Sequence, residues 1–447
     1  MSTTSNLPPG PSLPAAVQLA GFWTRPLAFL EQCRERYGKR FTLRLPFTPP
    51  FVMLTDPDEV KQVFTAPPDV LRPGEGARRV LEPIVGSNSV ILLDEGAHMA
   101  QRKLMLPAFH GERMERLTGV MEEVTAEEVA ALPRDVPVAL HPHMQDLTLK
   151  VILRAVFGLD PGSRFELLRD RLQGMLSFGE RPISLAPAAT ELLPAAIVER
   201  VGPFAHFLRM QREVDEIVFA LIAERRSEGS DRDDVLAMLI EARHEDGSPM
   251  SEQEIRDELL TLLVAGHETT ATSLAWAFSR LVHEPAVLAR LVEAIDAGED
   301  TYVTATVQET LRARPVLPNA APRQVAKPIE VGDWTYQPGC ALVANGYLIH
   351  HDPEIYPDPY AFRPERFLDE SPGTYTWIPF GGGRRRCLGA SFALLEMKVV
   401  LRALLGACEL RAAGGGVEVA QRRNITVCPA AGARVTLGNR ARVPAAA

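Results

Sequence analysis

The segment from Phe380 to Gly389 reads FGGGRRRCLG and leads into an apolar stretch from Leu388 to Leu405. Glycines let a backbone turn tightly without Cβ clashes. The apolar stretch predicts a helix, so Cys387 lies at its N-terminus, where unpaired N–H groups hydrogen-bond sulfur and lower a cysteine pKa. Such a thiolate serves as a metal ligand or a nucleophile, although a lone cysteine is more often a small buried apolar residue.

A second pair of candidate residues is His98 and Arg102, in the run HMAQRKLMLPAF. A spacing of four residues places both side chains on one helical face. Two cationic donors on one face are able to hold two carboxylates. An isolated pair of this kind, however, usually belongs to an ordinary polar helix surface.

A long helix is predicted from Ser251 to Val282. Ser251 and Glu254 have the pattern of a capping box, and Pro285 stops the helix. About 32 residues at 1.5 Å each give roughly 48 Å, enough to cross a molecule of this size. Because the helix is largely apolar, we expect it to be buried.

The middle of this helix carries the sequence AGHETT at positions 265 to 270. Gly266 is a poor helix former, and a threonine hydroxyl bonds a carbonyl one turn earlier, so a local kink is expected. A buried Glu268 beside Thr269 has two interpretations. It is either a capped polar defect in a core helix or a proton relay, since a carboxyl group of adjustable pKa passes protons through a hydroxyl and water.

A charged pair, Glu309 and Arg312, lies at helical spacing and is followed in the chain by the sequence PERF from Pro364 to Phe367. By itself such a pair is a common surface feature that contributes little to stability.

Taken together, these segments resemble the cytochrome P-450 superfamily of haem-thiolate monooxygenases. The family's cysteine-loop pattern, F-x-x-G-x-R-x-C-x-G, is matched by Phe380, Gly383, Arg385, Cys387 and Gly389. The H-x-x-x-R, A-G-x-E-T-T, E-x-x-R and P-E-R-F motifs precede it in family order. The resemblance implies a mainly α fold with small β-sheets, in which the haem lies between a long central helix and a cysteine loop.

The resemblance also assigns the cofactor, haem b, to particular residues. Cys387 is the expected axial thiolate on iron, a ligand type that favours O–O cleavage. Propionate contacts are expected from four cationic residues: His98, Arg102, Arg323 and Arg385. Phe380 and Ala265 are also expected beside the cofactor, with Ala265 and Gly266 leaving space over the iron.

Further roles follow from the same resemblance. Glu268 and Thr269 are the expected catalytic proton relay, and His267 is structural. A buried triad that supports the cysteine loop is expected from Glu309, Arg312 and Arg366, and breaking it strands a charge at a cost of several kcal/mol.

The implied reaction inserts one oxygen atom from O2 into a C–H bond of a lipophilic small molecule, such as a terpenoid, a steroid or a fatty acid. Met114 to Arg226 corresponds to the pocket roof, with mobile lid segments at 175–178 and 201–207. The predicted pocket residues are apolar: Val85, Val90, Ile91, Leu262, Ala265, Val316, Leu317, Ala320 and Val427.

Electrons must come from a separate carrier, because no flavin or iron–sulfur domain is visible in the chain. We expect an acidic ferredoxin or flavodoxin with its NAD(P)H reductase, docking near Arg384 and Arg386. Three alternatives to this oxidoreductase remain: a peroxide-driven hydroxylase, a haem-thiolate isomerase or dehydratase, and a non-catalytic haem sensor. The presence of both Glu268 and Thr269 disfavours the first and the last.

The bulk composition agrees with a bacterial member of this family that is soluble. At 447 residues, the chain shows no linker or repeat, so we expect a single domain over 1–447, with a Pro-rich segment at 1–20 and a flexible tail at 441–447. The net charge of −9 disfavours nucleic acid as a partner. Five scattered cysteines, no signal sequence and no membrane span predict a cytoplasmic protein, and we expect a monomer.

Minor β-structure is predicted at both ends of the chain. Alternating apolar residues from Phe41 to Leu45 and the segment 51–54 predict a hairpin, followed by a helix capped by Asp56. Gly332-Asp333 fits a type II′ turn between two strands, 329–331 and 334–336. Another strand is expected at 341–343, and a last hairpin from 425–427 with 432–437.

Overall fold

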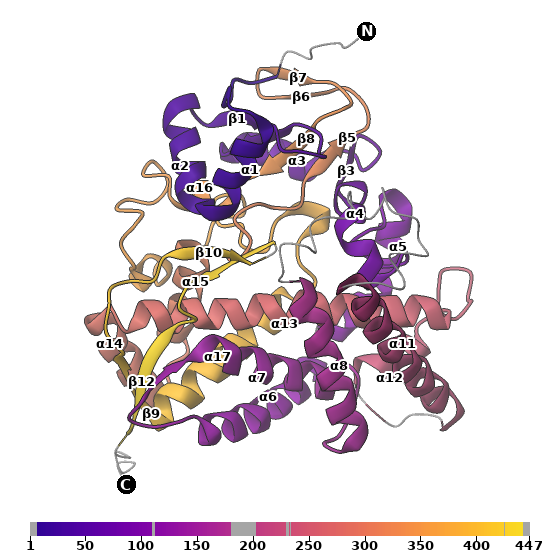
Figure 1. Ribbon diagram of the computed structural model, residues 1–447, viewed down its shortest axis with the longest axis vertical. Coiled ribbons are helices and arrows are strands. Elements are labelled where there is room, and N and C mark those ends of the chain that lie inside the picture. The colour runs from indigo at the N-terminus through magenta and orange to yellow at the C-terminus, as the bar shows by residue number, and fades with distance from the viewer. Residues whose placement is uncertain are drawn as a thin grey trace.

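The computed structural model describes residues 7–109, 112–179, 203–228, 232, 234–423 and 425–440. Within these ranges the chain is mainly helical, and its strands form small sheets of five, three, two and two strands. Figure 1 shows the five-stranded sheet at one end of the molecule and a bundle of helices at the other, with one long helix running between them. The predicted fold class, mainly α with small β-sheets, is confirmed.

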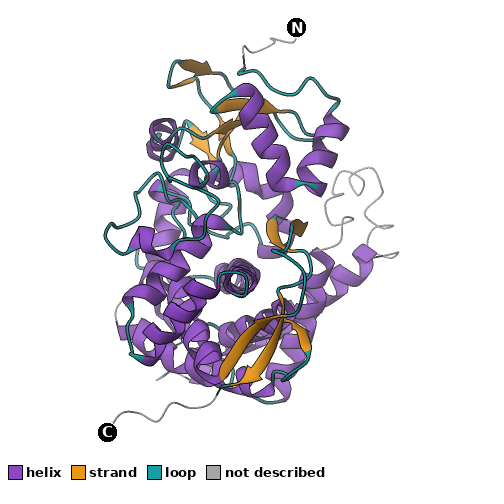
Figure 2. Ribbon diagram, turned by 90° about the vertical axis from the view of Figure 1, so that its left-hand side faces the viewer, coloured by secondary structure: helices purple, strands orange, loops and turns teal. Residues whose placement is uncertain are grey.

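The long helix is α13 (Glu252–Leu281), of 30 residues, which corresponds to about 45 Å. Its predicted capping box is present, since Glu254 N donates to Ser251 Oγ and the Glu254 carboxylate accepts from Ser251 N. Seen end-on in Figure 2, helices enclose it on several sides. Its partners include α7 (Leu140–Ala155), α11 (Pro203–Glu228) and α17 (Ala390–Ala407).

Local sequence signals also mark where other helices begin. For example, Pro26 occupies the first turn of α2, and Arg25 separates this helix from α1. The helix α1 shows that part of the Pro-rich segment 1–20 is helical. The bounds are α1 Ala15–Thr24, α2 Pro26–Tyr37, α3 Pro57–Thr65, α4 Pro73–Val85, α5 Glu95–Met105, α6 Glu112–Ala131, α8 Ser163–Gly179, α12 Val235–Glu241, α14 Pro285–Asp296, α15 Thr301–Ala313 and α16 Gly346–His350. Short 3₁₀ turns are η1 Leu106–Phe109, η3 Pro364–Phe367 and η4 Gly383–Arg385.

The largest sheet has the strand order β1-β2-β8-β5-β3. The predicted hairpin is confirmed by antiparallel pairing of β1 (Arg40–Leu43) with β2 (Phe51–Leu54), and Asp56 caps α3 as expected. The remaining strands of this sheet are β3 Leu71–Arg72, β5 Arg323–Val325 and β8 Ala341–Ala344. A separate hairpin pairs β6 (Ile329–Val331) with β7 (Trp334–Tyr336). Gly332 has a φ of 61°, as the first central residue of a type II′ turn requires.

The predicted last hairpin is wrong. Strand β11 (Thr426–Pro429) pairs with β10 (Ala420–Arg423), whereas β12 (Arg434–Asn439) pairs with β9 (Cys408–Ala412) and β4 (Pro137–Ala139). The two strands belong to different cores, because Val427 packs with Trp276 and the N-terminal helices while Leu437 packs in the helical core.

The predicted lid falls partly outside the described residues, which omit 180–202. Residues 175–178 belong to the end of α8, and 203–207 to the start of α11. None of the helices in the described ranges is long and apolar enough to span a bilayer.

Candidate active site

The cysteine loop is shaped by glycines that α3 approaches closely. A Cβ at Gly382 would lie 2.3 Å from the Phe64 ring, and one at Gly383 would lie 2.2 Å from the Phe64 carbonyl oxygen. Gly383 also has a φ of 63°, which favours glycine. The loop closes on itself, because Cys387 N donates to the Phe380 carbonyl at 3.0 Å. The glycine run is therefore required both for turning and for packing.

The Cys387 thiol lies two residues before Gly389, the N-cap of α17, which starts at Ala390 rather than at Leu388. Cys387 has accessible surface although protein atoms surround its sulfur and displace much of the solvent, whereas the other four cysteines are buried. The predicted lowering of its pKa is wrong for this state of the protein. Burial raises the Cys387 pKa, and the opposing hydrogen bond from Gly389 and the charges of Arg102 and Arg386 do not outweigh it.

The structure gathers the four predicted cationic residues, and one of them, Arg102, lies near the Cys387 thiol. The four are His98 and Arg102 from α5, Arg323 from β5 and Arg385 from the cysteine loop. Burial and, to a smaller extent, the charges of Arg385, Arg102 and Arg323 together lower the His98 pKa to about 3. Burial also lowers the pKa of both Arg323 and Arg385 to about 10, each helped by a neighbouring guanidinium. The site thus concentrates buried positive charge.

Asp94, the N-cap of α5, supplies a carboxylate that pairs with this cationic cluster. Arg385 Nη2 lies 2.6 Å from Asp94 Oδ1, and the same guanidinium donates to the carbonyls of Val90 and Ile91 at 3.3 and 3.4 Å. Among the described residues none forms a hydrogen bond or an ion pair with the Arg102 side chain. The Arg323 guanidinium donates to the Val63 carbonyl at 3.1 Å and lies over the Phe64 ring. Three guanidiniums facing one carboxylate fit a group that brings further carboxylates, as the two propionates of haem do.

The centre of α13 shows the predicted hydroxyl-to-carbonyl bond, since Thr269 Oγ1 donates to the Ala265 carbonyl at 2.6 Å. Ala265 is exposed although Leu263 is fully buried, so this face of α13 borders accessible space. Gly266 does not share that face. A Cβ there would lie 3.2 Å from Ile152 Cδ1 of α7, so the expectation that Gly266 leaves space over the iron is wrong, and its role is close helix packing.

Glu268 is bound to α7 and to its own helix rather than to Thr269. Its oxygens accept from Gln145 Nε2 at 2.6 Å and from Thr272 Oγ1 at 3.0 Å, and His141 Nε2 lies at 3.5 Å. Burial alone would raise the Glu268 pKa, but the hydrogen bonds from His141 and Gln145 and the charge of Arg423 lower it to about 2. The structure therefore shows a carboxylate held away from its expected partner.

His267, which lies between Gly266 and Glu268 in the chain, also faces α7. Its Nδ1 lies 2.9 Å from Thr148 Oγ1, and burial lowers its pKa to about 4. The ring is therefore neutral near pH 7 and is engaged in packing between the two helices.

The charged triad is assembled as expected. Glu309 and Arg312, both fully buried, form two hydrogen bonds of 2.6 and 2.8 Å, and Arg366 Nε lies 3.6 Å from Glu309. Arg312 also donates to the His350 carbonyl at 2.8 Å, and the His350 ring accepts from Ile378 N at 2.9 Å, two residues before Phe380. The triad is thus connected to the cysteine loop through one histidine.

The predicted pocket residues are brought together in part. Val90 and Ile91 lie against Arg385 through their carbonyls, and Leu262 and Ala265 are one turn apart on α13. Val427 N donates to the Val316 carbonyl at 2.9 Å, but Val427 is buried in the core beside Trp276. The other three predicted residues lie in two places. Val85 is buried at the end of α4, and Leu317 and Ala320 are half-buried in the segment before β5.

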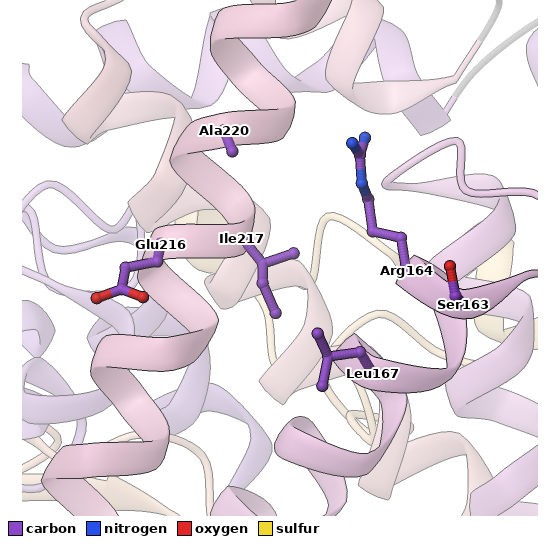
Figure 3. A pocket seen from close by; sticks show the side chains of 6 residues that line it. All are labelled: Ser163, Arg164, Leu167, Glu216, Ile217 and Ala220. Atoms are coloured by element: carbon purple, nitrogen blue, oxygen red, sulfur yellow. The ribbon is translucent and has the colours of Figure 1, made fainter.

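A pocket elsewhere contains none of these residues. It lies between α8 and α11 and is lined by Ser163, Arg164 and Leu167 of α8 and by Glu216, Ile217 and Ala220 of α11; Ile217 points toward Leu167, whereas the Glu216 carboxylate points away from α8 (Figure 3).

Sequence reasoning missed several residues of the site. Asp94, His141 and Gln145 have no motif of their own, and each becomes visible only when α5 or α7 is packed. A signal was available for Asp94, since an aspartate directly before a helix is a typical N-cap.

The fold and the site define a class, a helical protein with a long central helix, a cysteine loop and a cationic cluster suited to a dicarboxylate cofactor. A family model, "Cytochrome P450", matches residues 6–437. The chain belongs to the cytochrome P450 family and is an oxidoreductase of the monooxygenase type, with haem bound through an axial cysteine thiolate.

Relatives at the sequence level include cytochromes P450 of mycobacteria. Cytochrome P450 135B1 of Mycobacterium tuberculosis is 39% identical, covering 97% of this chain and 92% of the relative. Cytochrome P450 138 of the same organism is 38% identical, covering 97% of both chains. Among solved structures, cyanobacterial CYP120A1 with bound retinoic acid matches with a TM-score of 0.81 at 22% identity, covering 98% of this chain and 100% of its own. The haem domain of cytochrome P450DA matches with a TM-score of 0.82 at 22% identity, covering 97% of this chain and 98% of its own.

Proposed function

We propose that Cys387 is the axial thiolate and that the protein inserts one oxygen atom from O2 into a C–H bond of a terpenoid, a steroid or a fatty acid. The observation that carries the assignment is the position of this thiol beside Arg102, which belongs to a cluster with His98 and Arg385 that holds more positive charge than Asp94 balances. Cys408 is the contrasting cysteine. It is buried at the start of β9 and has only Arg134 as a charged neighbour that affects its pKa.

In this proposal the haem supplies the oxygen chemistry, and the chain's own residues bind, orient and move protons. Arg102, Arg323 and Arg385 would hold the propionates, and Gly389 N–H would stabilise the sulfur. The Thr269 hydroxyl would pass protons supplied by Glu268 toward the space beside Ala265. The apolar side chains of Val90, Ile91 and Leu262 would exclude water from that space. This lining has few ionisable groups, which supports a lipophilic substrate.

Arg384 and Arg386 are exposed beside the cysteine loop, which supports docking of an acidic ferredoxin or flavodoxin that receives its electrons from an NAD(P)H reductase. All five cysteines are free, which suits a reducing compartment such as the cytoplasm. We also propose that the protein is a single-domain monomer.

The test is the absorbance of the reduced, CO-bound protein in wild type, Cys387→Ser and Cys408→Ser. We expect a strongly red-shifted Soret band in wild type and in Cys408→Ser, and its loss in Cys387→Ser. Retention of the band in Cys387→Ser would overturn the ligand assignment. A screen of terpenoids, steroids and fatty acids for a substrate-induced Soret shift, followed by turnover under labelled O2, then tests the substrate class. Products lacking the label would refute oxygen insertion.

A further inference from the structure

The Glu268 carboxylate is held by a set of contacts that we call the α7 dock, formed by His141, Gln145 and Thr272. Gln145 Nε2 donates to Oε2 at 2.6 Å, and Thr272 Oγ1 donates to Oε1 at 3.0 Å. His141 Nε2 lies 3.5 Å from Oε1 and 3.0 Å from Thr272 Oγ1. Both carboxylate oxygens are therefore engaged, and neither contact comes from Thr269, whose hydroxyl donates to the Ala265 carbonyl.

His141 is itself fixed in place. It is 3% exposed, its backbone N donates to the Gly432 carbonyl at 2.9 Å, and Arg423 Nη1 lies 3.4 Å from its Nδ1. Because an arginine can only donate, this contact makes Nδ1 the acceptor and leaves the ring proton on Nε2, which faces Glu268 and Thr272. The β10 strand that carries Arg423 thus sets which tautomer of His141 faces the carboxylate.

The charged and titratable groups around the dock favour a charged Glu268. Arg423 from β10 and the donors of α7 stabilise the carboxylate, while Asp146 of α7 is paired with Lys150 at 2.7 Å and His267 of α13 is bound to Thr148. A charge-assisted hydrogen bond is stronger than a neutral one. A docked Glu268 therefore carries no proton near neutral pH and has none to give.

We propose that His141 and Gln145 are positioning residues that keep Glu268 docked on α7 as a carboxylate, and that proton delivery to Thr269 requires this carboxylate to leave the dock. The inference rests on the proposed relay role of Glu268 and Thr269. Once released, the carboxylate takes a proton from a hydronium ion of the solvent network, so that one O–H bond breaks, one forms and a water molecule is left. It then gives this proton to the Thr269 oxygen as the hydroxyl passes its own proton to dioxygen that the redox partner's electrons have reduced, and Glu268 returns to the dock as a carboxylate.

The direct test follows the carboxyl of Glu268 by NMR. Protein labelled with ¹³C at glutamate side-chain carboxyls is titrated from about pH 5 to 8 in the reduced, CO-bound form, and the Glu268→Gln variant assigns the signal. We expect no titration of this signal in wild type. In the His141→Leu/Gln145→Leu variant we expect the signal to titrate within the window, because burial then dominates and raises the pKa.

His143→Leu is the matched control, since this histidine lies on the same helix but contacts Glu128 at 3.3 Å rather than Glu268. It should leave the Glu268 signal unchanged. His141→Gln keeps a side-chain donor without a titrating ring, so it should retain most of the dock and guards against a misfolded double variant. Titration of the Glu268 signal in wild type between pH 5 and 8, or an unchanged signal in the His141→Leu/Gln145→Leu variant, would overturn the proposal.

A second readout separates the dock from the relay. If Glu268 delivers protons, Glu268→Gln should lower product formed per NADPH consumed and raise peroxide release several-fold, and the dock variants should change the solvent isotope effect on turnover. Unchanged coupling in Glu268→Gln together with the expected NMR result would refute the relay and leave the dock intact. The opposite pair of results would refute the dock alone.

Discussion

Glu309→Gln tests the energetic weight of the buried triad. The change keeps the side-chain shape and removes the charge that faces Arg312, which is fully buried and also bonded to three carbonyls. Glu309 further accepts from Arg363 N at 2.7 Å and lies 3.6 Å from Arg366. Removing one partner of a buried ion pair leaves an uncompensated charge and costs about 3–5 kcal/mol. The Gln amide also places a donor against a guanidinium, so we expect no recovery of this loss.

The matched control is Glu365→Gln in the neighbouring PERF segment. Glu365 pairs with Arg290 at 3.0 Å, and both side chains are 40–49% exposed, so the loss should be about 0–1 kcal/mol. Urea unfolding followed by far-UV circular dichroism and tryptophan fluorescence measures both variants. A loss below about 1 kcal/mol for Glu309→Gln, or equal losses for the two variants, would refute the reasoning that burial makes the triad costly to break.

Three further predictions concern other sites. Arg323→Met should stabilise the haem-free chain against urea by up to about 3 kcal/mol, because burial lowers the Arg323 pKa from 12.5 to about 10 and each pKa unit is worth about 1.4 kcal/mol. The same variant should release haem faster to apomyoglobin. Slower release would contradict the propionate assignment. Burial raises the Glu396 pKa from 4.5 to about 8, so the folded state keeps a proton that the unfolded chain loses, and wild-type stability should fall between these pH values. Glu396→Gln should therefore gain stability over wild type as pH rises through this window, and equal pH profiles would count against it. Arg384→Glu/Arg386→Glu should slow reduction by an acidic ferredoxin about tenfold at low salt, with an unchanged CO spectrum; undiminished reduction would place the docking surface elsewhere.

The sequence was sufficient where a pattern is local. The capping box at Ser251, the hairpin turn at Gly332 and the helical face shared by His98 and Arg102 all depend on residues a few positions apart, and the structure has each of them. The pairing of β12 was not predictable in this way, because its partners are β9, which precedes the β10–β11 hairpin in the chain, and β4, which lies in the first third of the chain.

The site shows the same division. The motifs supplied Cys387 and Glu268, but they do not say which way a side chain points once two helices pack. The orientation of Glu268 toward α7 depends on Gln145 and His141, more than a hundred positions earlier. Likewise, the rise in the Cys387 pKa is a matter of burial, which a local pattern of glycines and arginines does not report.

The contact between α3 and the cysteine loop limits how this enzyme can be diversified by directed evolution. Randomising Gly382 or Gly383 would push a side chain into Phe64, so most library members at these positions would lose the loop before any change of selectivity could be seen. Gly389 is different, since a Cβ there meets nothing within 4 Å and its φ is −85°. A library that aims to alter the surroundings of the sulfur has more freedom at 389 than in the glycine run that precedes it.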